Sequence, residues 1–257
     1  MVLRFICMSS LFSSDAMAEG YARDRPAVHP WVIAQVRDRM RNPAKRALDV
    51  GCGSGLSTAA LYKTAAHCVG VEPAEAMLAW SNQVAPNAEF AVGRAEQLPF
   101  ATGSFDLITA AGSLNYCDLA PALKEIIRVM TSDGALVVYD FSQGKDFADS
   151  PALDEWHTEF KSRYQAPESG KKLEPGGAPF SMSLPYTAER YLKYAMTETN
   201  VSNAIARGTP VREVADWCAA ELTKAFAGQT RQVVFKGYIA IKSKRAINEW
   251  LRRLPVS

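Results

Sequence analysis

A glycine-rich segment is the part of this sequence whose residue types and spacing best suit chemistry. The stretch Leu48-Asp49-Val50 leads into the turn Gly51-Cys52-Gly53-Ser54-Gly55, and a helical pattern follows. Glycine has no Cβ, so the backbone of such a turn can approach a ligand closely. The helix N-terminus behind it offers unpaired N–H groups and the positive end of the helix dipole. The segment therefore predicts a nucleotide or carboxylate at the C-terminal end of the preceding strand.

The residues around the turn narrow the choice of ligand. The dinucleotide fingerprint Gly-x-Gly-x-x-Gly, counted from Gly51, requires glycine where this chain has Leu56. A P-loop is excluded because neither Gly-Lys-Ser nor Gly-Lys-Thr follows. Glu72 ends the next expected strand, and its carboxylate can accept hydrogen bonds from both ribose hydroxyls of an adenosine. These residues favour an adenosine-containing ligand.

The elements that must position these residues alternate between strand and helix. We expect strands at 46–50, 68–72, 89–92, 105–110 and 135–139, and helices at 56–66, 74–83 and 120–130. The last of these strands is apolar throughout, as expected for a parallel sheet covered on both faces. Alternating strands and helices form βαβ units, so the sequence predicts an α/β fold with a parallel sheet.

The flanking segments follow other patterns. The spacing of Trp31, Val32, Val36 and Met40 predicts an N-terminal helix. Residues 165–185 contain four Pro and three Gly, so we expect a long irregular loop there, in which Lys171 and Lys172 are solvated. We also expect a helix at 185–196, a helix from the N-cap Thr209 to just before Gly228, and one or two antiparallel edge strands at 232–241.

Further motifs follow the glycine-rich turn in a fixed order. They are Val71-Glu72-Pro73 with Met77-Leu78, then 93–100 (Gly-Arg-Ala-Glu-Gln-Leu-Pro-Phe), 104–108 (Ser-Phe-Asp-Leu-Ile), 122–130 and Asp133-Gly134. Together with 48–55 they resemble the class I S-adenosylmethionine (SAM)-dependent methyltransferases, in the small-molecule subgroup of type 11, UbiE-like and trans-aconitate methyltransferase-like proteins. Tyr21 with Arg25-Pro26 resembles the N-terminal element of this subgroup.

The resemblance implies a fold and a cofactor. The fold is a Rossmann-like, seven-stranded, mostly parallel sheet with helices on both faces, an N-terminal helix and a largely helical insertion that covers the active site. The cofactor is SAM, with S-adenosylhomocysteine (SAH) as product. The implied segments are 1–40 (N-terminal segment and lid helix), 41–141 (SAM-binding core), 142–230 (substrate-covering insertion of the same domain) and 231–257 (final strands and C-terminal helix).

The resemblance also implies roles for individual residues. Asp49 and the backbone of Gly51 and Gly53 hold the methionine end of SAM, over which Tyr21 closes, and Glu72 binds the ribose. Ala95 and Glu96 flank the adenine, and Ala111-Gly112 lie under the sulfonium. The residues expected at the cofactor are Tyr21, Arg25, Asp49, Gly51, Cys52, Gly53, Glu72, Pro73, Met77, Arg94, Ala95, Glu96, Ala111 and Gly112.

Two departures from the family pattern concern affinity and catalysis. Arg94 stands where relatives have Asp, and arginine cannot accept a hydrogen bond from the adenine amino group, although it can stack on the ring. The segment 112–117 lacks the histidine that often follows the fourth strand, and Asn115 cannot act as a base. Both departures motivate an alternative, a SAM- or SAH-binding protein without catalysis.

Some residues are candidates for catalysis or acceptor binding outside the cofactor motifs. His157 is the candidate general base. Trp156 is either an acceptor contact or, with Phe160 one helical turn away, part of the core. Cys52 is more simply a small filler of the turn than a reactive thiol. The residues expected to contact the acceptor are Asn115, Tyr116, Trp156 and Asn200.

Composition limits the class of partner. The 29 Lys and Arg against 27 Asp and Glu give a net charge of +2, well short of the basic bias of a nucleic-acid-binding domain. No run of about 18 apolar residues occurs, so we expect no membrane span. None of the five Cys shows Cys-x-x-Cys spacing, so we expect no disulfide scaffold or metal site, and reduced thiols favour a cytoplasmic protein.

The N-terminal residues only partly resemble a signal peptide. Ser9 and Ser10 interrupt the apolar stretch, and Asp15 lies beside the Ala16-Met17-Ala18 sequence that could mimic a cleavage site. We therefore expect no signal peptide and a start at either Met1 or Met8.

These observations favour in-line transfer of a methyl group to a small-molecule acceptor by a monomer or homodimer. An RNA or protein methyltransferase, a non-catalytic SAM-binding protein and an NAD-dependent oxidoreductase stay open as alternatives.

Overall fold

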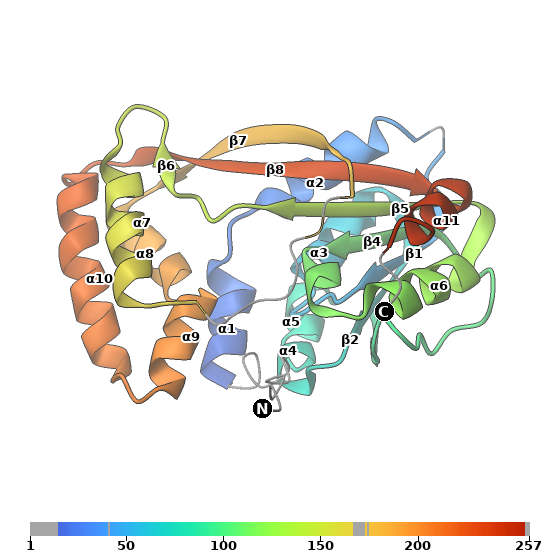
Figure 1. Cartoon of the computed structure of the whole chain (residues 1–257), viewed down its shortest axis with the longest axis horizontal. Coiled ribbons are helices and arrows are strands. Elements are labelled where there is room, and N and C mark those ends of the chain that lie inside the picture. Colours follow the sequence, from blue (N-terminus) through green and yellow to red (C-terminus); the bar gives the residue numbers. More distant parts are fainter. Residues whose placement is uncertain (1–14, 41, 167–172, 174, 255–257) are drawn as a thin grey trace. The chain divides into compact units, whose positions relative to one another are not determined.

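The computed structural model describes residues 15–40, 42–166, 173 and 175–254 (Figure 1). The expectations about residues 1–14 and about Lys171 and Lys172 lie outside these residues. The chain divides into two compact units, each described here by itself. Unit 1 contains the described residues of Met1–Pro26, Phe141–Ser169 and Phe180–Gly237, and unit 2 contains those of Ala27–Asp140, Gly170–Pro179 and Tyr238–Ser257.

The described strands form one sheet in the order β3-β2-β1-β4-β5-β8-β6, and β7 pairs with β8. The strands are β1 (Ala44–Val50), β2 (Ala65–Glu72), β3 (Glu89–Val92), β4 (Phe105–Ala111), β5 (Met130–Phe141), β6 (Asp146–Phe147), β7 (Ala178–Tyr186) and β8 (Arg231–Ser243). The pairs β1–β2, β1–β4, β2–β3 and β4–β5 are parallel, whereas β6 and β8 are antiparallel. The expected α/β, mostly parallel sheet is confirmed, although it has eight described strands rather than seven.

Two strands, β6 and β7, occur where we expected none, and β7 lies in the segment that the prolines led us to expect as irregular. Pro179 and Pro185 lie near its two ends, where a missing N–H costs a sheet least. Only Tyr186 of β7 is buried. The expected antiparallel strand at 232–241 is confirmed as β8, which pairs antiparallel with β6. Its expected position at the edge was wrong, because β8 lies between β5 and β6 in the sheet order.

The described helices of unit 2 precede, connect or follow the strands. They are α2 (Val28–Arg37), α3 (Leu56–Ala60), η2 (Leu61–Lys63), α4 (Glu75–Leu78), α5 (Ser81–Val84), η3 (Ser113–Tyr116), α6 (Leu119–Val129) and α11 (Lys244–Leu251). The expected helix at 56–66 ends early because Ala65 pairs with Ala44 at the start of β2, so sheet pairing overrides the helix propensity of alanine. The expected helix at 74–83 is divided into α4 and α5.

The core of unit 2 lies between the sheet and α6. Ala122, Leu123, Ile126 and Val129 form the buried face of this helix, with helical spacing. They join strand residues such as Leu48 in one apolar cluster. Burying each large aliphatic side chain contributes about 1.5–3 kcal/mol, so this cluster fixes the strands whose ends carry the site.

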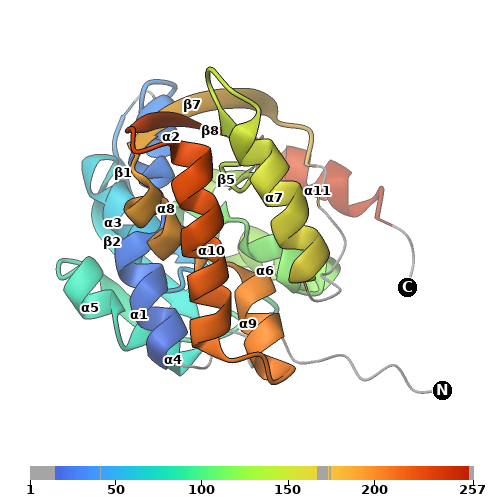
Figure 2. The ribbon, with the colours of Figure 1, turned by 90° about the vertical axis from the view of Figure 1, so that its left-hand side faces the viewer.

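The described helices of unit 1 lie beside one another (Figure 2). They are α1 (Asp15–Asp24), α7 (Ala152–Arg163), α8 (Ala188–Ala195), α9 (Thr199–Ala206) and α10 (Val211–Phe226). The N-cap of α10 is Pro210 rather than the expected Thr209. Asn200, which lies between the helices expected at 185–196 and from Thr209, belongs to α9.

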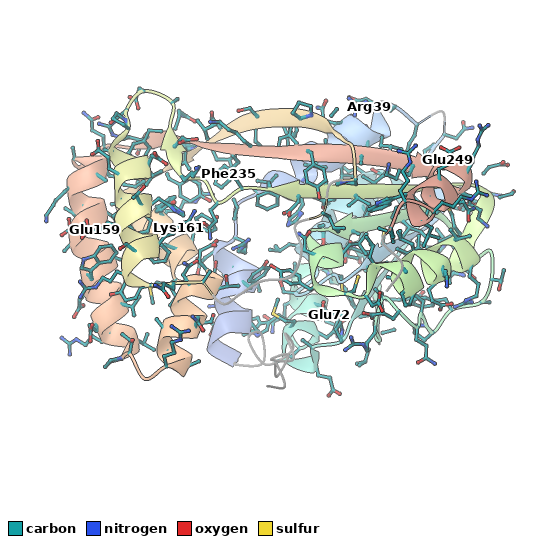
Figure 3. All side chains as sticks on the ribbon, in the orientation of Figure 1. Arg39, Glu72, Glu159, Lys161, Phe235 and Glu249 are labelled. Atoms are coloured by element: carbon teal, nitrogen blue, oxygen red, sulfur yellow. The ribbon has the colours of Figure 1, made fainter. Side chains whose placement is uncertain are left out.

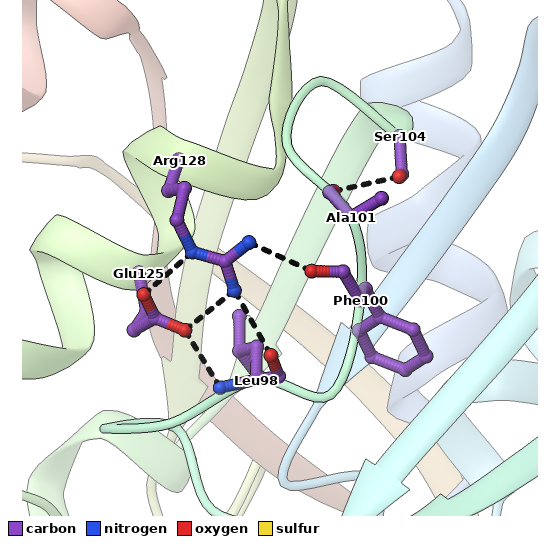
Figure 4. A network of polar contacts seen from close by, with 6 residues as sticks. All are labelled: Leu98, Phe100, Ala101, Ser104, Glu125 and Arg128. Atoms are coloured by element: carbon purple, nitrogen blue, oxygen red, sulfur yellow. Dashed lines mark hydrogen bonds and ion pairs between the residues drawn. The ribbon is translucent and has the colours of Figure 1, made fainter.

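A charged network ties α6 to the segment before β4 (Figure 4). Arg128 pairs with Glu125 at 2.7 Å and donates to the carbonyls of Leu98 and Phe100 at 2.9 and 2.7 Å. Glu125 in turn accepts from the Leu98 N–H at 2.8 Å. Arg128 thereby binds two loop carbonyls, of which that of Leu98 also accepts from the Phe100 N–H at 2.8 Å.

Replacement of Arg128 by methionine should destabilise the fold. We expect the free energy of unfolding to fall by about 1–2 kcal/mol, because the loop carbonyls lose charged donors while the side chain stays partly screened by water. Urea unfolding measures the change. The control Arg245→Met removes an ion pair whose arginine is 90% exposed and should leave stability unchanged. An equal loss in both variants contradicts the prediction.

Candidate functional site

The glycine-rich turn adopts a backbone that only glycine accommodates easily. Gly51, Gly53 and Gly55 have φ values of 68°, 56° and 91°. A Cβ on Gly51 would lie 2.3 Å from the Cβ of Ser113. The N–H groups of Gly51 and Cys52 donate to the Val71 carbonyl at 2.8 and 3.1 Å, so the turn is fixed to the end of β2.

Asp49 lies just before this turn, and its carboxylate is fully buried. Ser57 and Thr58 donate to Oδ2 at 2.6 and 2.8 Å, and Thr109 donates to Oδ1 at 2.8 Å. Burial raises the pKa of Asp49, although these three hydroxyl donors oppose the shift. The carboxylate therefore joins β1, α3 and β4. The sequence reasoning missed these hydroxyl partners, although Ser57-Thr58 at the start of a helix was a usable signal.

Glu72 connects the end of β2 to the turn (Figure 3). Its two carboxylate oxygens accept from the Gly53 and Ala74 N–H groups at 3.1 and 3.0 Å. Burial raises the pKa of Glu72 despite these two bonds. Each oxygen has a second lone pair, so the side chain can still accept from ligand hydroxyls.

Three other expected residues lie close to the turn. Pro73 is exposed directly after β2, and Met77 of α4 is buried, with its Cε 3.2 Å from the position of a Cβ on Gly53. Cys52 is buried, and desolvation raises the pKa of its thiol. A buried, protonated thiol is unreactive, which supports the interpretation of Cys52 as a filler.

Arg94, Ala95 and Glu96 follow β3. The Arg94 side chain is 60% exposed, and its Nη2 lies 3.5 Å from Glu96 Oε1. The same Glu96 oxygen accepts from the N–H of Asp118, the N-cap residue of α6, at 2.8 Å. Glu96 therefore has a structural partner in addition to the role expected beside the adenine.

The segment after β4 is tied to the end of β5. Gly112 has a φ of 69°, and its N–H donates to the Tyr139 carbonyl at 2.9 Å. Asn115 donates to Asp140 Oδ2 at 2.9 Å and accepts from the Leu173 N–H at 3.1 Å, whereas Tyr116 is 45% exposed. We had not singled out Asp140, although a carboxylate directly after an apolar strand could have indicated it.

Two expected cofactor residues, Tyr21 and Arg25, belong to unit 1. The Arg25 guanidinium lies over the Tyr21 ring, 4.5 Å from its centroid, and pairs with the buried Glu198 at 2.7 Å. Desolvation lowers the pKa of Arg25, but Tyr21, Glu198 and Tyr194 outweigh it and raise the pKa overall. Gln143 also donates to Glu198. Within unit 1, Arg25 therefore connects the end of α1 to the start of α9.

The remaining candidates are buried among the aromatic side chains of unit 1. Trp156 stacks on Phe160, with centroids 4.9 Å apart. His157 is 3% exposed, and desolvation, with a smaller effect of Lys161, lowers its pKa to about 4. Asn200 donates to the Tyr164 carbonyl at 2.6 Å. These contacts give Trp156 and Asn200 clear packing roles and make His157 a weak proton acceptor at neutral pH.

The structure thus brings most of the expected cofactor residues together in unit 2. The exceptions, Tyr21 and Arg25, are in unit 1 with His157, Trp156 and Asn200. Within the described residues, no cluster of His, Cys, Asp and Glu could hold a metal ion. In the same part of the chain, no helix is long and apolar enough to cross a membrane.

Comparison with known proteins agrees with this geometry. Residues 48–138 match a family model described as a methyltransferase domain. The uncharacterised methyltransferase YcgJ of Bacillus subtilis is 32% identical over 117 residues, which cover 43% of this chain and 45% of the relative. A demethylmenaquinone methyltransferase of Beutenbergia cavernae is 37% identical over 101 residues, which cover 39% and 42%. The chain thus spans less than half the length of these relatives.

A solved structure extends the likeness of fold. A candidate type II methyltransferase from Anaeromyxobacter dehalogenans has a TM-score of 0.66 and 21% identity, and the match covers 86% of this chain and 98% of that one. This similarity shows the fold. The expected resemblance to class I methyltransferases and the Rossmann-like fold are confirmed.

The raised pKa of Asp49 predicts an unusual pH dependence of stability. A carboxyl group whose pKa is higher in the folded state than its unfolded value of about 3.9 stabilises the fold most at low pH. This contribution is lost as pH rises through the folded pKa. Relative to the wild type, Asp49→Asn should therefore gain stability as pH rises above about 4, the unfolded pKa.

Urea unfolding at several pH values measures this difference. Asp38→Asn, which changes a side chain that is 62% exposed, is the matched control and should follow the wild type. A difference between Asp49→Asn and the wild type that stays constant with pH contradicts the prediction.

Proposed function

We propose that this chain, whose residues 48–138 match a family model described as a methyltransferase domain, binds SAM and transfers its methyl group to a small molecule. The observation that carries the proposal is the position of Glu72. Its carboxylate lies beside the Gly51–Gly53 turn, at the carboxyl ends of neighbouring parallel strands. Open α/β sheets bind ligands at this edge.

The described residues fit an adenosine-bearing cofactor. At Gly51 the space that a side chain would need is already taken by Ser113, so the turn keeps a bare backbone toward its ligand. Glu72 holds the turn through one lone pair of each oxygen and can bind the ribose hydroxyls through the others. The Asp49 side chain is fully buried, so we propose that it holds the turn in shape and does not contact the cofactor.

The chain contributes mainly alignment. When bound, SAM supplies a methyl group activated by its sulfonium. Gly51, Gly53 and Glu72 hold the cofactor, Ala95 and Glu96 flank the adenine, and Ala111-Gly112 lie under the reacting end. Holding both reactants in line can supply a large part of the acceleration. We assign Tyr21 and Arg25 to closing over the methionine end.

We propose a small molecule, rather than a polymer, as the methyl acceptor. Support comes from the near-neutral charge of the chain and from the relative named a demethylmenaquinone methyltransferase, whose acceptor is a small molecule. We infer that residues 142–230 select the acceptor, with Asn115 and Tyr116 as further contacts. We further propose that the protein is a monomer or homodimer. The absence of Cys-x-x-Cys spacing is consistent with a cytoplasmic location.

A second candidate function is binding without catalysis. The exposed Arg94 favours it, because no carboxylate at that position accepts from the adenine amino group. Binding of SAM and SAH with no methylation of any member of a broad metabolite panel would support this alternative. If the acceptor is instead an RNA or a protein, the same preparation should methylate that polymer.

Isothermal calorimetry with SAM, SAH and NAD tests the proposal. SAM and SAH should bind and NAD should not. Glu72→Gln should weaken SAM binding by about 10- to 100-fold, because hydrogen bonds to a charged acceptor contribute about 1.5–3 kcal/mol. Glu75→Gln, which changes an exposed residue of α4, should bind like the wild type. Binding of NAD alone would overturn the proposal.

The affinity for SAM should also depend on pH through Glu72. Its raised pKa means that the carboxylate is protonated at a higher pH than an ordinary glutamate. The dissociation constant should therefore increase as pH falls through this pKa. Glu72→Gln should lack this dependence, whereas Glu75→Gln should retain it. Equal pH profiles for all three proteins contradict the assignment of Glu72 to the ribose.

A further inference from the structure

A histidine and a tyrosine outside the family motifs form a hydrogen-bonded pair in unit 2. His29 Nδ1 lies 2.8 Å from the hydroxyl of Tyr139, and the two rings meet edge to face at a centroid distance of 5.8 Å. Tyr139 is fully buried, whereas His29 is partly exposed. His29 lies in the first turn of α2, and Tyr139 lies near the end of β5.

The register of the sheet places Tyr139 beside the expected reacting end of the cofactor. Tyr139 is paired with Ala111 across β4 and β5, and Thr109 of β4 is paired with Asp49 of β1. Paired residues of parallel strands, and residues two positions apart, point to the same face of a sheet. Asp49, Thr109, Ala111 and Tyr139 therefore share one face. Burial raises the pKa of Tyr139, and the nearby Asp49 adds to the shift.

The position of His29 is fixed by the packing of its helix. Val28, Val32, Ile33 and Val36 of α2 are buried, and α2 contacts α3, the helix that follows the glycine-rich turn. The hydrogen bond to Tyr139 then holds the imidazole at the carboxyl edge of β4 and β5. Of the three histidines in the chain, His157 is enclosed in unit 1 and His67 lies near the start of β2.

Tyr139 is a suitable partner for a histidine that takes up a proton. Its raised pKa keeps the phenol neutral, and a neutral hydroxyl can donate to Nδ1 or accept from Nδ1–H. The hydrogen bond can therefore persist in both protonation states of His29. The ring keeps its orientation while its charge changes.

We propose that His29 is the catalytic base of the methyl transfer and that Tyr139 is its positioning residue. The proposal rests on the function proposed above. The acceptor is a small molecule whose reacting oxygen or nitrogen carries a proton. That proton moves to Nε2 of His29 while the acceptor atom forms its bond to the methyl carbon. The carbon–sulfur bond breaks, its electron pair stays on sulfur, and the products are the methylated acceptor, SAH and the imidazolium.

A titration tests this position without knowledge of the acceptor. SAM carries a positive sulfonium and SAH a neutral thioether, so a histidine beside the methyl group should titrate lower with SAM than with SAH. We expect a difference of about 0.5–1 pKa unit for His29. Nuclear magnetic resonance of the ring protons measures it, and His29→Gln assigns the signal. His67, near the amino end of β2, is the internal control and should titrate equally in both complexes.

The outcomes distinguish this inference from the proposed function. If SAM and SAH bind but His29 titrates equally in both complexes, the inference is overturned and the proposed function stands. If neither compound binds, both are overturned.

The role of Tyr139 has its own test. Tyr139→Phe keeps the ring and removes the hydroxyl, so the pKa of His29 should move while that of His67 stays the same. An unchanged titration of His29 in Tyr139→Phe overturns the positioning role.

Discussion

In unit 2, three hydroxyl groups converge on the buried carboxylate of Asp49, and the geometry of the site depends on this contact. The contact joins the end of β1 to the start of α3, across the glycine-rich turn, and also to the neighbouring strand β4. A buried carboxylate is costly unless its oxygens are satisfied, so the three donors are required together. Because the turn between these elements has positive φ at each glycine, it needs both of its ends held. Glu72 completes the arrangement by bonding the turn from β2.

The sequence predicted the parts of the fold in which local pattern and tertiary packing agree. The strand at 89–92 has the expected bounds, and the helix at 120–130 is shifted by only one residue, because its apolar spacing matches its buried face. The prediction failed where a long-range contact decided the outcome. Ala65 is a good helix former, yet it lies in β2 and pairs with Ala44 of β1. Pro179 lies in β7, a strand that pairs with β8. Neither partner can be identified from the residues near the misassigned position.

For the candidate site, motif order identified the backbone frame but not what each side chain contacts. The resemblance named Asp49 and Glu96 as cofactor residues, and the structure gives both of them protein partners. A motif shows which residue types recur in a family. It does not distinguish a residue that contacts the ligand from one that positions the contacting residue. Trp156 and Asn200 are a related case. Their polar and aromatic character suggested contact with an acceptor, and their burial in unit 1 gives them packing partners. Such a distinction requires coordinates.

The position of the base follows from the same reasoning about burial and charge. A group that accepts a proton during catalysis must reach the acceptor and must be able to carry a charge afterwards. His157 is enclosed by aromatic rings, and desolvation lowers its pKa to about 4, so a charged His157 is strongly disfavoured at neutral pH. His29 is partly exposed and has a neutral phenol that can bond either protonation state. The missing histidine after β4 therefore does not leave the chain without a candidate base, because α2 supplies His29 from a different part of the sequence.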